Sequence, residues 1–267
     1  MKPDKYSLGI GDRFGLQGAA QLRALAMAEE RGLRISPVWN KSNREHGIIG
    51  TTPADTRREA DGAVKELGWK GPYFVDADHI GASTVEAYTG PCDFFTIDVA
   101  DFIGTPAPPE AVGEFLRAMA PCRGEISIPG LDRPIDGGEG VLRNVADRYL
   151  NAVKEAGRVY RRILASRGGN GFVAEVSLDE SDAPQSPGEL FFILGAIAGE
   201  GIPLQTIAPK FTGSFLKGVD YVGDAGVFGR EFEQDIAVVA FASRTFHLPE
   251  DLKLSVHTGS DKFSLYP

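Results

Sequence analysis

Short apolar runs alternate along the chain with longer stretches in which apolar residues recur at helical spacing. The runs predict seven strands, at residues 6–11, 34–39, 72–79, 94–98, 171–176, 203–208 and 252–257. The stretches between them predict helices at 17–31, 52–67, 140–167, 187–198 and 228–246. Thr52 and Pro53 are typical of the cap and first position of a helix. A less regular segment, 123–138, contains only a short β-like run at 125–128.

Strands that alternate with helices of ten or more residues are typical of right-handed β-α-β crossovers and a parallel sheet. Seven such units favour a TIM (β/α)8 barrel over a doubly wound sheet. Gly9 and Gly11 begin a dinucleotide-binding pattern, but Phe14 occupies the place of its last glycine. We therefore expect an α/β fold with one barrel domain over residues 1–267, apparently lacking the last β-α unit.

Composition and charge favour a soluble enzyme over a protein that binds nucleic acid or membranes. The 267 residues are 42% hydrophobic, and 28 Lys and Arg against 37 Asp and Glu give a net charge of −9. An acidic chain offers no basic field for nucleic acid or an anionic membrane. No apolar run approaches the roughly 20 residues of a membrane span, and the N-terminus lacks an apolar signal core. We expect a cytoplasmic enzyme that acts on a small molecule, with homo-oligomerisation left open.

Two cysteines and two of the four histidines carry no evident chemistry. Cys92 and Cys122 do not make a disulfide framework and are expected to pack as small apolar residues. His46 sits in a polar stretch interpreted as a loop, and His247 follows a predicted helix. These two histidines are expected to be structural or exposed.

Ionisable residues gather where the predicted strands end. In a parallel barrel these ends and the loops after them form the active site. A solvated loop charge is the alternative for any single residue, but convergence on one face favours a site. The group comprises Asp12, Arg13, Asp76, Asp78, His79, Asp98, Asp101, Glu175, Asp179, Glu180, Lys210, His257, Asp261 and Lys262.

His79 and His257 are the best metal candidates because both lie at strand ends. Imidazole combined with carboxylate suits a divalent cation such as Mn, Zn, Ni or Co. A third ligand must come from elsewhere, and Asp220 is preferred to Asp224, which also fits an ordinary aspartate-glycine turn. No tight His-x-Glu-x-His spacing supports the assignment.

Asp78 and Glu175 come from different predicted strands and are candidates for acid–base catalysis. One carboxylate would remove a proton from a bound sugar, and the other would return one. A metal beside them would stabilise an enolate or enediolate oxygen. The alternative makes Glu175 a buried partner of Lys210.

Lys210 follows a strand and invites comparison with lysines that form Schiff bases in one class of aldolase. With two histidines at strand ends, a role in binding a substrate carboxylate or hydroxyl is preferred. Lys262 and its neighbour Asp261 are candidates for the same task. Arg13 is another, because a guanidinium holds a carboxylate through two parallel hydrogen bonds; a surface arginine in a turn is its alternative.

Six segments in order resemble the tagaturonate epimerases: GDRFG at 11–15, DADH at 76–79, FTID at 95–98, EVSLDE at 175–180, KGVDY at 217–221 and HTGSDKFS at 257–264. The resemblance implies a metal-dependent barrel enzyme that interconverts D-tagaturonate and D-fructuronate in hexuronate breakdown. Carried over by position, it implies Asp78 as proton acceptor and Glu175 as proton donor. It implies His79 and His257 as metal ligands, with Asp220 as the third.

The resemblance also implies an additional N-terminal segment and a continuation beyond the last motif that supplies the eighth strand. The inverted carbon of such a substrate lies one position beyond the carbon next to the ketone. Retro-aldol cleavage and re-addition is therefore a hypothesis beside direct deprotonation. A class II aldolase acting on a related keto-sugar acid is the alternative function, and a barrel that only binds a sugar acid or a partner is a third.

Overall fold

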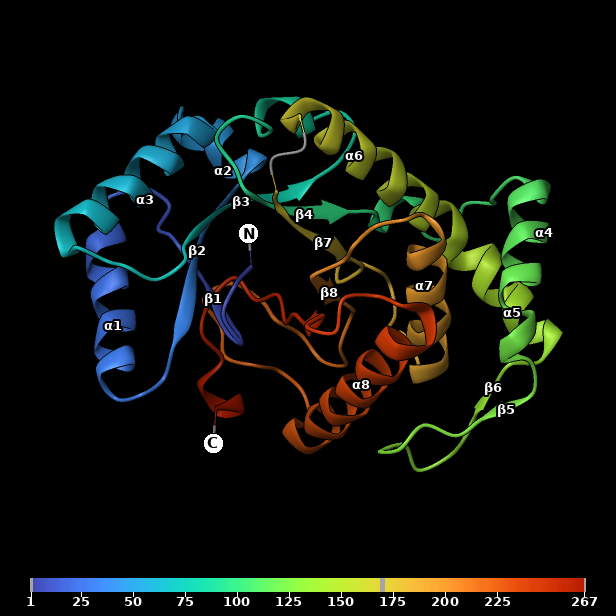
Figure 1. Cartoon of the computed structure of the whole chain (residues 1–267). Coiled ribbons are helices and arrows are strands. Elements are labelled where there is room, and N and C mark those ends of the chain that lie inside the picture. The colour runs from blue at the N-terminus through green and yellow to red at the C-terminus, as the bar shows by residue number, and fades with distance from the viewer. Residues whose placement is uncertain (1, 169–170, 267) are drawn as a thin grey trace. The chain divides into compact units, whose positions relative to one another are not determined.

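The computed structural model describes residues 2–168 and 171–266, and its elements are shown in Figure 1. The chain divides into two compact units, Met1–Asp98 with Arg158–Glu175, and Val99–Gly157 with Val176–Pro267. Strand β7 (Val173–Ser177) passes from the first unit into the second. Each unit is described separately below.

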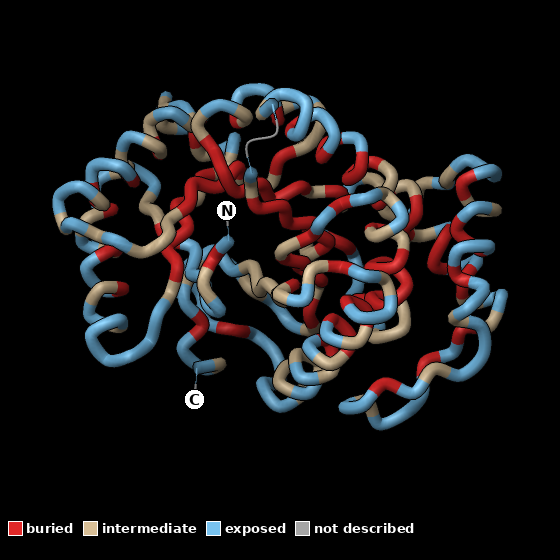
Figure 2. The backbone as a smooth tube through the Cα atoms, viewed as in Figure 1, coloured by how far each residue is buried: buried red, intermediate tan, exposed pale blue. Residues whose placement is uncertain are grey.

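The first unit contains parallel strands joined by helices. Its strands are β1 (Tyr6–Ile10), β2 (Ile35–Ser42), β3 (Phe74–Ile80) and β4 (Phe94–Asp98), followed in the sheet by β7. The three pairings from β1 to β4 are all parallel. Helices α1 (Gly18–Glu30) and α3 (Pro53–Leu67) pack against each other and against β2. Buried residues concentrate in β2, β3 and β4 (Figure 2).

Local sequence sets the limits of the helices that follow β2. Thr52 and Asp55 form a reciprocal capping box at the start of α3, and Gly68 ends it in the left-handed conformation that glycine adopts without strain. The prediction of a helix from Thr52 to Leu67 is confirmed, with Thr52 as the cap. Helix α2 (Asn43–Ile49) was not expected, and Ser42 caps it by accepting a hydrogen bond from the backbone of Glu45.

The interpretation of His46 as a loop residue is therefore wrong, although its structural role is confirmed. The residue lies within α2 and is buried. Its Nδ1 lies 2.8 Å from the hydroxyl of Thr51. Burial, reinforced by the positive charge of Lys41, lowers the pKa of His46.

The second unit begins with a 3₁₀ helix (Ala100–Phe102), which is followed by α4 (Pro109–Ala118) and the antiparallel pair β5 (Glu125–Ile126) and β6 (Ile135–Asp136). A continuous helical segment follows, comprising α5 (Glu139–Val145), a π-helical turn (Ala146–Leu150) and α6 (Asn151–Arg167), which crosses into the first unit. The long helix expected at 140–167 is confirmed, apart from the π-helical turn. Helix α4 was not among the predicted helices.

The rest of the second unit consists of α7 (Pro187–Gly199), β8 (Thr206–Ala208), α8 (Ala225–Phe246) and β9 (Lys253–Leu254). The sheet order here is β7-β8-β9, and β8 and β9 are parallel. Helices α7 and α8 pack together, and the ring of Phe191 lies 4.8 Å from that of Phe246. β8 and β9 are shorter than the runs that predicted them.

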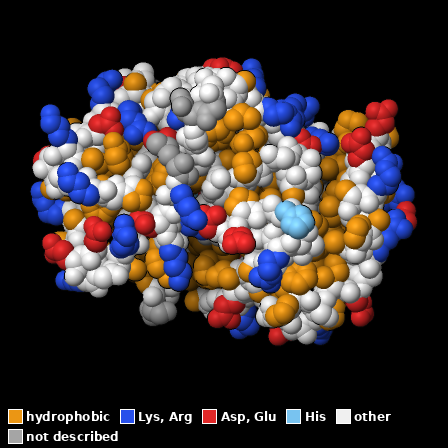
Figure 3. Space-filling view, in the orientation of Figure 1, with side chains coloured by type: hydrophobic (Ala, Val, Ile, Leu, Met, Phe, Trp, Pro, Cys, Tyr) orange, Lys and Arg blue, Asp and Glu red, His pale blue; other side chains and the backbone are white. Residues whose placement is uncertain are grey.

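The structure confirms the α/β class and all seven expected strands, whereas closure into an eight-stranded barrel remains a prediction. No helix within residues 2–168 and 171–266 is both long and apolar enough to cross a membrane. On the face shown in Figure 3, described Lys and Arg side chains lie scattered among Asp and Glu rather than in one basic patch. Cys92 is buried and Cys122 half-buried, both as free thiols.

Candidate active site

One face of the parallel strands in the first unit is polar near the carboxyl ends. Side chains alternate between the two faces of a strand, so Asp76 and Asp78 share one face of β3. In the parallel register they lie beside Asn40 and Ser42 of β2. The carboxyl ends of β2 and β3 therefore place four polar side chains next to one another on one face of the sheet.

Two carboxylates on this face meet at one threonine hydroxyl. Asp76, Thr96 and Glu175 are 6%, 1% and 2% exposed. Thr96 Oγ1 lies 3.1 and 3.0 Å from the two carboxylate oxygens of Asp76 and 3.2 Å from Glu175 Oε1. The backbone N–H of Thr96 also donates to Asp76 Oδ1, at 3.2 Å. The site thus holds two acidic groups largely excluded from water.

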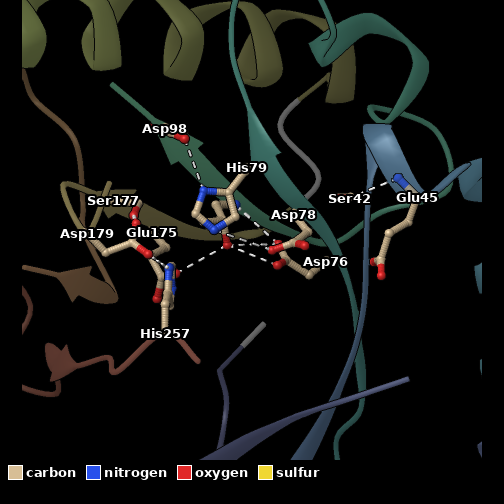
Figure 4. A network of polar contacts seen from close by, with 11 residues as sticks. Ser42, Glu45, Asp76, Asp78, His79, Asp98, Glu175, Ser177, Asp179 and His257 are labelled. Atoms are coloured by element: carbon tan, nitrogen blue, oxygen red, sulfur yellow. Dashed lines mark hydrogen bonds and ion pairs between the residues drawn. The ribbon is translucent and has the colours of Figure 1, made fainter. Parts of the chain in front are cut away.

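His79 leaves the regular geometry of β3. Its φ is +51°, a left-handed conformation that costs a residue with a Cβ roughly 1–3 kcal/mol. The register of β3 with β4 shifts at the same point, between Ala77 and Ile80. The irregularity directs the ring of His79 toward Asp98, and its Nδ1 lies 3.0 Å from Asp98 Oδ2 (Figure 4). A carboxylate on Nδ1 fixes the orientation of the ring, and Nε2 lies 3.9 Å from Asp78 Oδ1.

His257 has a carboxylate neighbour in the second unit. Ser255 extends the pairing of β9 with β8 by donating its N–H to the carbonyl of Ile207, and His257 follows two residues later. Its Nδ1 lies 3.3 Å from Asp179 Oδ2. Asp179 follows the end of β7 and accepts a hydrogen bond from the hydroxyl of Ser177. Asp179 appeared among the ionisable strand ends, yet nothing in its spacing singled it out.

Asp220, the expected third ligand, is hydrogen-bonded to two residues of the second unit, Tyr221 and Ser264. Its Oδ1 accepts hydrogen bonds from the backbone N–H groups of Tyr221 and Ser264 and from the hydroxyl of Ser264. The hydrogen bond from Tyr221, supported by those from Ser264, holds the pKa of Asp220 below its ordinary value. Asp224 caps α8 by accepting a hydrogen bond from the N–H of Val227.

Of the four residues expected to bind substrate, Arg13, Asp261 and Lys262 have side-chain partners within their own units, and Lys210 is held through its backbone. Arg13 is half-exposed and lies 3.7 Å from the carboxylate of Glu45. The backbone N–H of Lys210 donates to Gln185 Oε1. The hydroxyl of Tyr266 donates to Asp261. Lys262 is buried, and its ammonium donates to the carbonyl and hydroxyl oxygens of Ser260. Their roles toward a substrate remain predictions.

Comparison with known proteins assigns the chain to a family. The model of the tagaturonate epimerase family matches residues 1–116 and 133–267, which include every candidate site residue. The chain belongs to the tagaturonate epimerase family. The resemblance of its six motifs is thereby confirmed.

Relatives of known structure or curated function agree with this assignment. The tagaturonate/fructuronate epimerase of Thermotoga maritima is 32% identical over 274 residues, covering 98% of this chain and 54% of that protein. The native crystal structure of fructuronate-tagaturonate epimerase from Cohnella laeviribosi matches with a TM-score of 0.80 and 25% identity, over 100% of this chain and 54% of that one. The crystal structure of a glycerol complex of the same enzyme matches with a TM-score of 0.79 and 25% identity. The chain spans about half the length of these relatives.

Proposed function

We propose that this chain carries the catalytic groups of a metal-dependent epimerase that interconverts D-tagaturonate and D-fructuronate in the cytoplasm. The family match carries the proposal, because it extends through every segment that contributes a site residue. The buried carboxylates and the two histidine–carboxylate pairs supply groups that acid–base catalysis on a keto-sugar acid requires.

We propose that His79, His257 and Asp179 bind one divalent cation. Donor atoms bonded to one ion at about 2.1 Å lie roughly 3.0–3.4 Å apart in octahedral or tetrahedral geometry. The separation of 3.3 Å between His257 Nδ1 and Asp179 Oδ2 fits two adjacent ligands. Asp98 orients His79, as carboxylates commonly orient metal-binding histidines. Asp220 is the alternative carboxylate, and Asp179→Asn and Asp220→Asn distinguish the two by metal content.

The cation, Mn, Zn, Ni or Co, would supply electrostatic stabilisation of a developing enediolate oxygen when bound. Asp78 is the proposed proton acceptor and Glu175 the proposed donor. Burial of Glu175 keeps water from competing for its proton. Arg13, Lys210 and Lys262 are proposed to bind the substrate carboxylate, and Asp261 a hydroxyl.

The test is conversion of purified D-tagaturonate by the metal-loaded chain, followed by chromatography of the products. We expect D-fructuronate to form, and a chelator to stop the reaction. A well-folded, metal-loaded chain that leaves both keto-uronates unchanged would contradict the proposal. Two shorter products would indicate the aldolase alternative.

The route is tested in the same assay run in deuterated water. Deuterium at the inverted carbon indicates direct deprotonation, whereas a trapped cleavage fragment without deuterium indicates retro-aldol cleavage. His79→Ala should abolish conversion. His247→Ala is the matched control, because His247 ends α8 outside the proposed ligand set.

A further inference from the structure

Two glycines let segment 11–18, the connection from β1 into the first residue of α1, lie directly against a side chain of α3 in the first unit (Figure 1). A Cβ added at Gly15 would lie 3.1 Å from Glu59 Oε2, and one added at Gly18 would lie 2.9 Å from Glu59 Oε1. Gly15 also has a φ of +69°, a conformation that favours glycine. The carboxylate of Glu59 therefore supports the segment at two points, three residues apart.

The carboxylate of Asp12 fixes the same segment from within. It accepts hydrogen bonds from the backbone N–H groups of Phe14, Leu16 and Gln17, at 3.0, 3.0 and 2.7 Å. A turn closed by an aspartate in this way holds its backbone in one conformation. The backbone on both sides of Arg13 is thereby fixed.

Buried residues of β2 surround the carboxylate of Glu59. Trp39 is buried, and its Nε1 lies 3.1 Å from the Cβ position of Gly18 that Glu59 Oε1 also approaches. Lys41 is buried as well, and its ammonium lies 3.6 Å from the Cβ position of Gly15. Segment 11–18 is thus attached to the sheet and to α3 at the place where Glu59 lies.

Arg13 lies within this attached segment and points to a replaceable partner. Its side chain is 47% exposed, and its Nε lies 3.7 Å from Glu45 Oε1. An ion pair open to water on one side is weak, so a substrate carboxylate is able to displace Glu45. A guanidinium binds a carboxylate through two parallel hydrogen bonds only in one orientation. A fixed backbone at Arg13 is therefore what such binding needs.

We infer that Glu59 is a positioning residue that acts through Arg13, because it holds segment 11–18 in place and so directs the guanidinium toward the substrate carboxylate. The inference rests on the proposed function, in which Arg13 binds that carboxylate. Arg13 would hold the carboxylate equally in the ground state and the transition state. Loss of Glu59 should therefore raise KM and leave kcat nearly unchanged.

Three variants separate this role from a general effect on α3. Glu59→Ala removes the carboxylate, whereas Glu59→Gln keeps its size. Burial, followed by the negative charge of Asp12, raises the pKa of Glu59, so a neutral side chain of the same size is a conservative replacement. Glu66→Ala is the matched control, because Glu66 is exposed on the same helix.

The first test is steady-state kinetics of the metal-loaded chain with D-tagaturonate, with folding checked by circular dichroism. Glu59→Ala should raise KM at least about tenfold, the loss expected when a hydrogen bond to a charged group is weakened, while Glu59→Gln and Glu66→Ala stay near wild type. In an Arg13→Ala background, Glu59→Ala should change KM little, because no guanidinium is left to misplace. A purely structural role of Glu59 would raise KM equally in both backgrounds.

The second test is hydrogen exchange of the amides of Phe14, Leu16 and Gln17, which needs no turnover. Glu59→Ala should accelerate the exchange of all three, and Glu66→Ala should not. Unchanged exchange at these amides in Glu59→Ala would overturn the inference, as would a rise in KM that is the same with and without Arg13.

A further variant decides if Glu59→Ala does not fold. Gly18→Ala places a Cβ where Glu59 Oε1 lies and should displace the same carboxylate, with the same dependence on Arg13 in KM and the same faster exchange. A chain that shows the expected exchange but converts neither keto-uronate would refute the proposed function and leave the attachment of the segment by Glu59 standing.

Discussion

Replacing Asp235 with asparagine should stabilise the second unit at alkaline pH. Asp235 lies on α8 and is 3% exposed. Burial, and to a lesser degree the charge of Glu231 one turn earlier, raises the pKa of Asp235 from 3.8 to about 7. The folded state therefore prefers the neutral acid.

The sign follows from proton linkage. Because the folded pKa lies above the unfolded one, ionisation favours unfolding, and stability falls as the pH rises from about 4 to about 7. The shift of roughly three pKa units, at 1.36 kcal/mol each, corresponds to about 4 kcal/mol at pH 8. Asparagine is neutral at every pH and of similar size, so it should avoid this loss.

Urea denaturation at pH 4 and pH 8 measures the effect. We expect Asp235→Asn to exceed the wild type in free energy of unfolding by about 4 kcal/mol at pH 8, with much of that advantage lost at pH 4. Asp132→Asn, at an exposed position, is the matched control and should change little at either pH. A difference between wild type and Asp235→Asn that is the same at both pH values would refute the reasoning.

Two further substitutions test local geometry by the same denaturation assay. Ser186→Ala removes the cap of α7, where Ser186 and Glu189 satisfy each other's backbone N–H groups, and should cost about 1 kcal/mol; an unchanged midpoint would contradict the capping role. Gly11→Ala should cost more than Gly140→Ala, because Gly11 has a φ of +137° and its added Cβ would lie 2.8 Å from the carbonyl oxygen of Asn40. Equal losses at the two glycines would contradict this account.

Helices with clear capping residues were predictable from the sequence. A helix of only seven residues and the lengths of the shortest strands were not. The start of α3 follows from Thr52 and Pro53, and the structure places both as expected. Helix α2 was hidden because its residues are mostly polar and it has only seven of them. β8 and β9 retain only three and two paired residues of six-residue apolar runs, because an apolar run indicates burial but not how far hydrogen bonding extends.

The sequence predicted which candidate site residues lie on strands, but not which of them are in contact. The apolar runs at 72–79 and 94–98 were enough to place Asp78 and Thr96 on strands, but the contact between Thr96 and Glu175 depends on how distant strands pair. The left-handed backbone of His79 is likewise a tertiary property, because a short pattern does not specify a strained φ. Asp179 lacked a sequence signal because its proximity to His257 spans much of the chain.

We propose that His79 and His257 bind one cation together, and the metal content of the purified chain measures this directly. Elemental analysis of the purified chain should give one divalent ion per molecule. His79→Ala and His257→Ala should each lose it, while His247→Ala keeps the full complement. Full metal occupancy in both ligand variants would contradict the account.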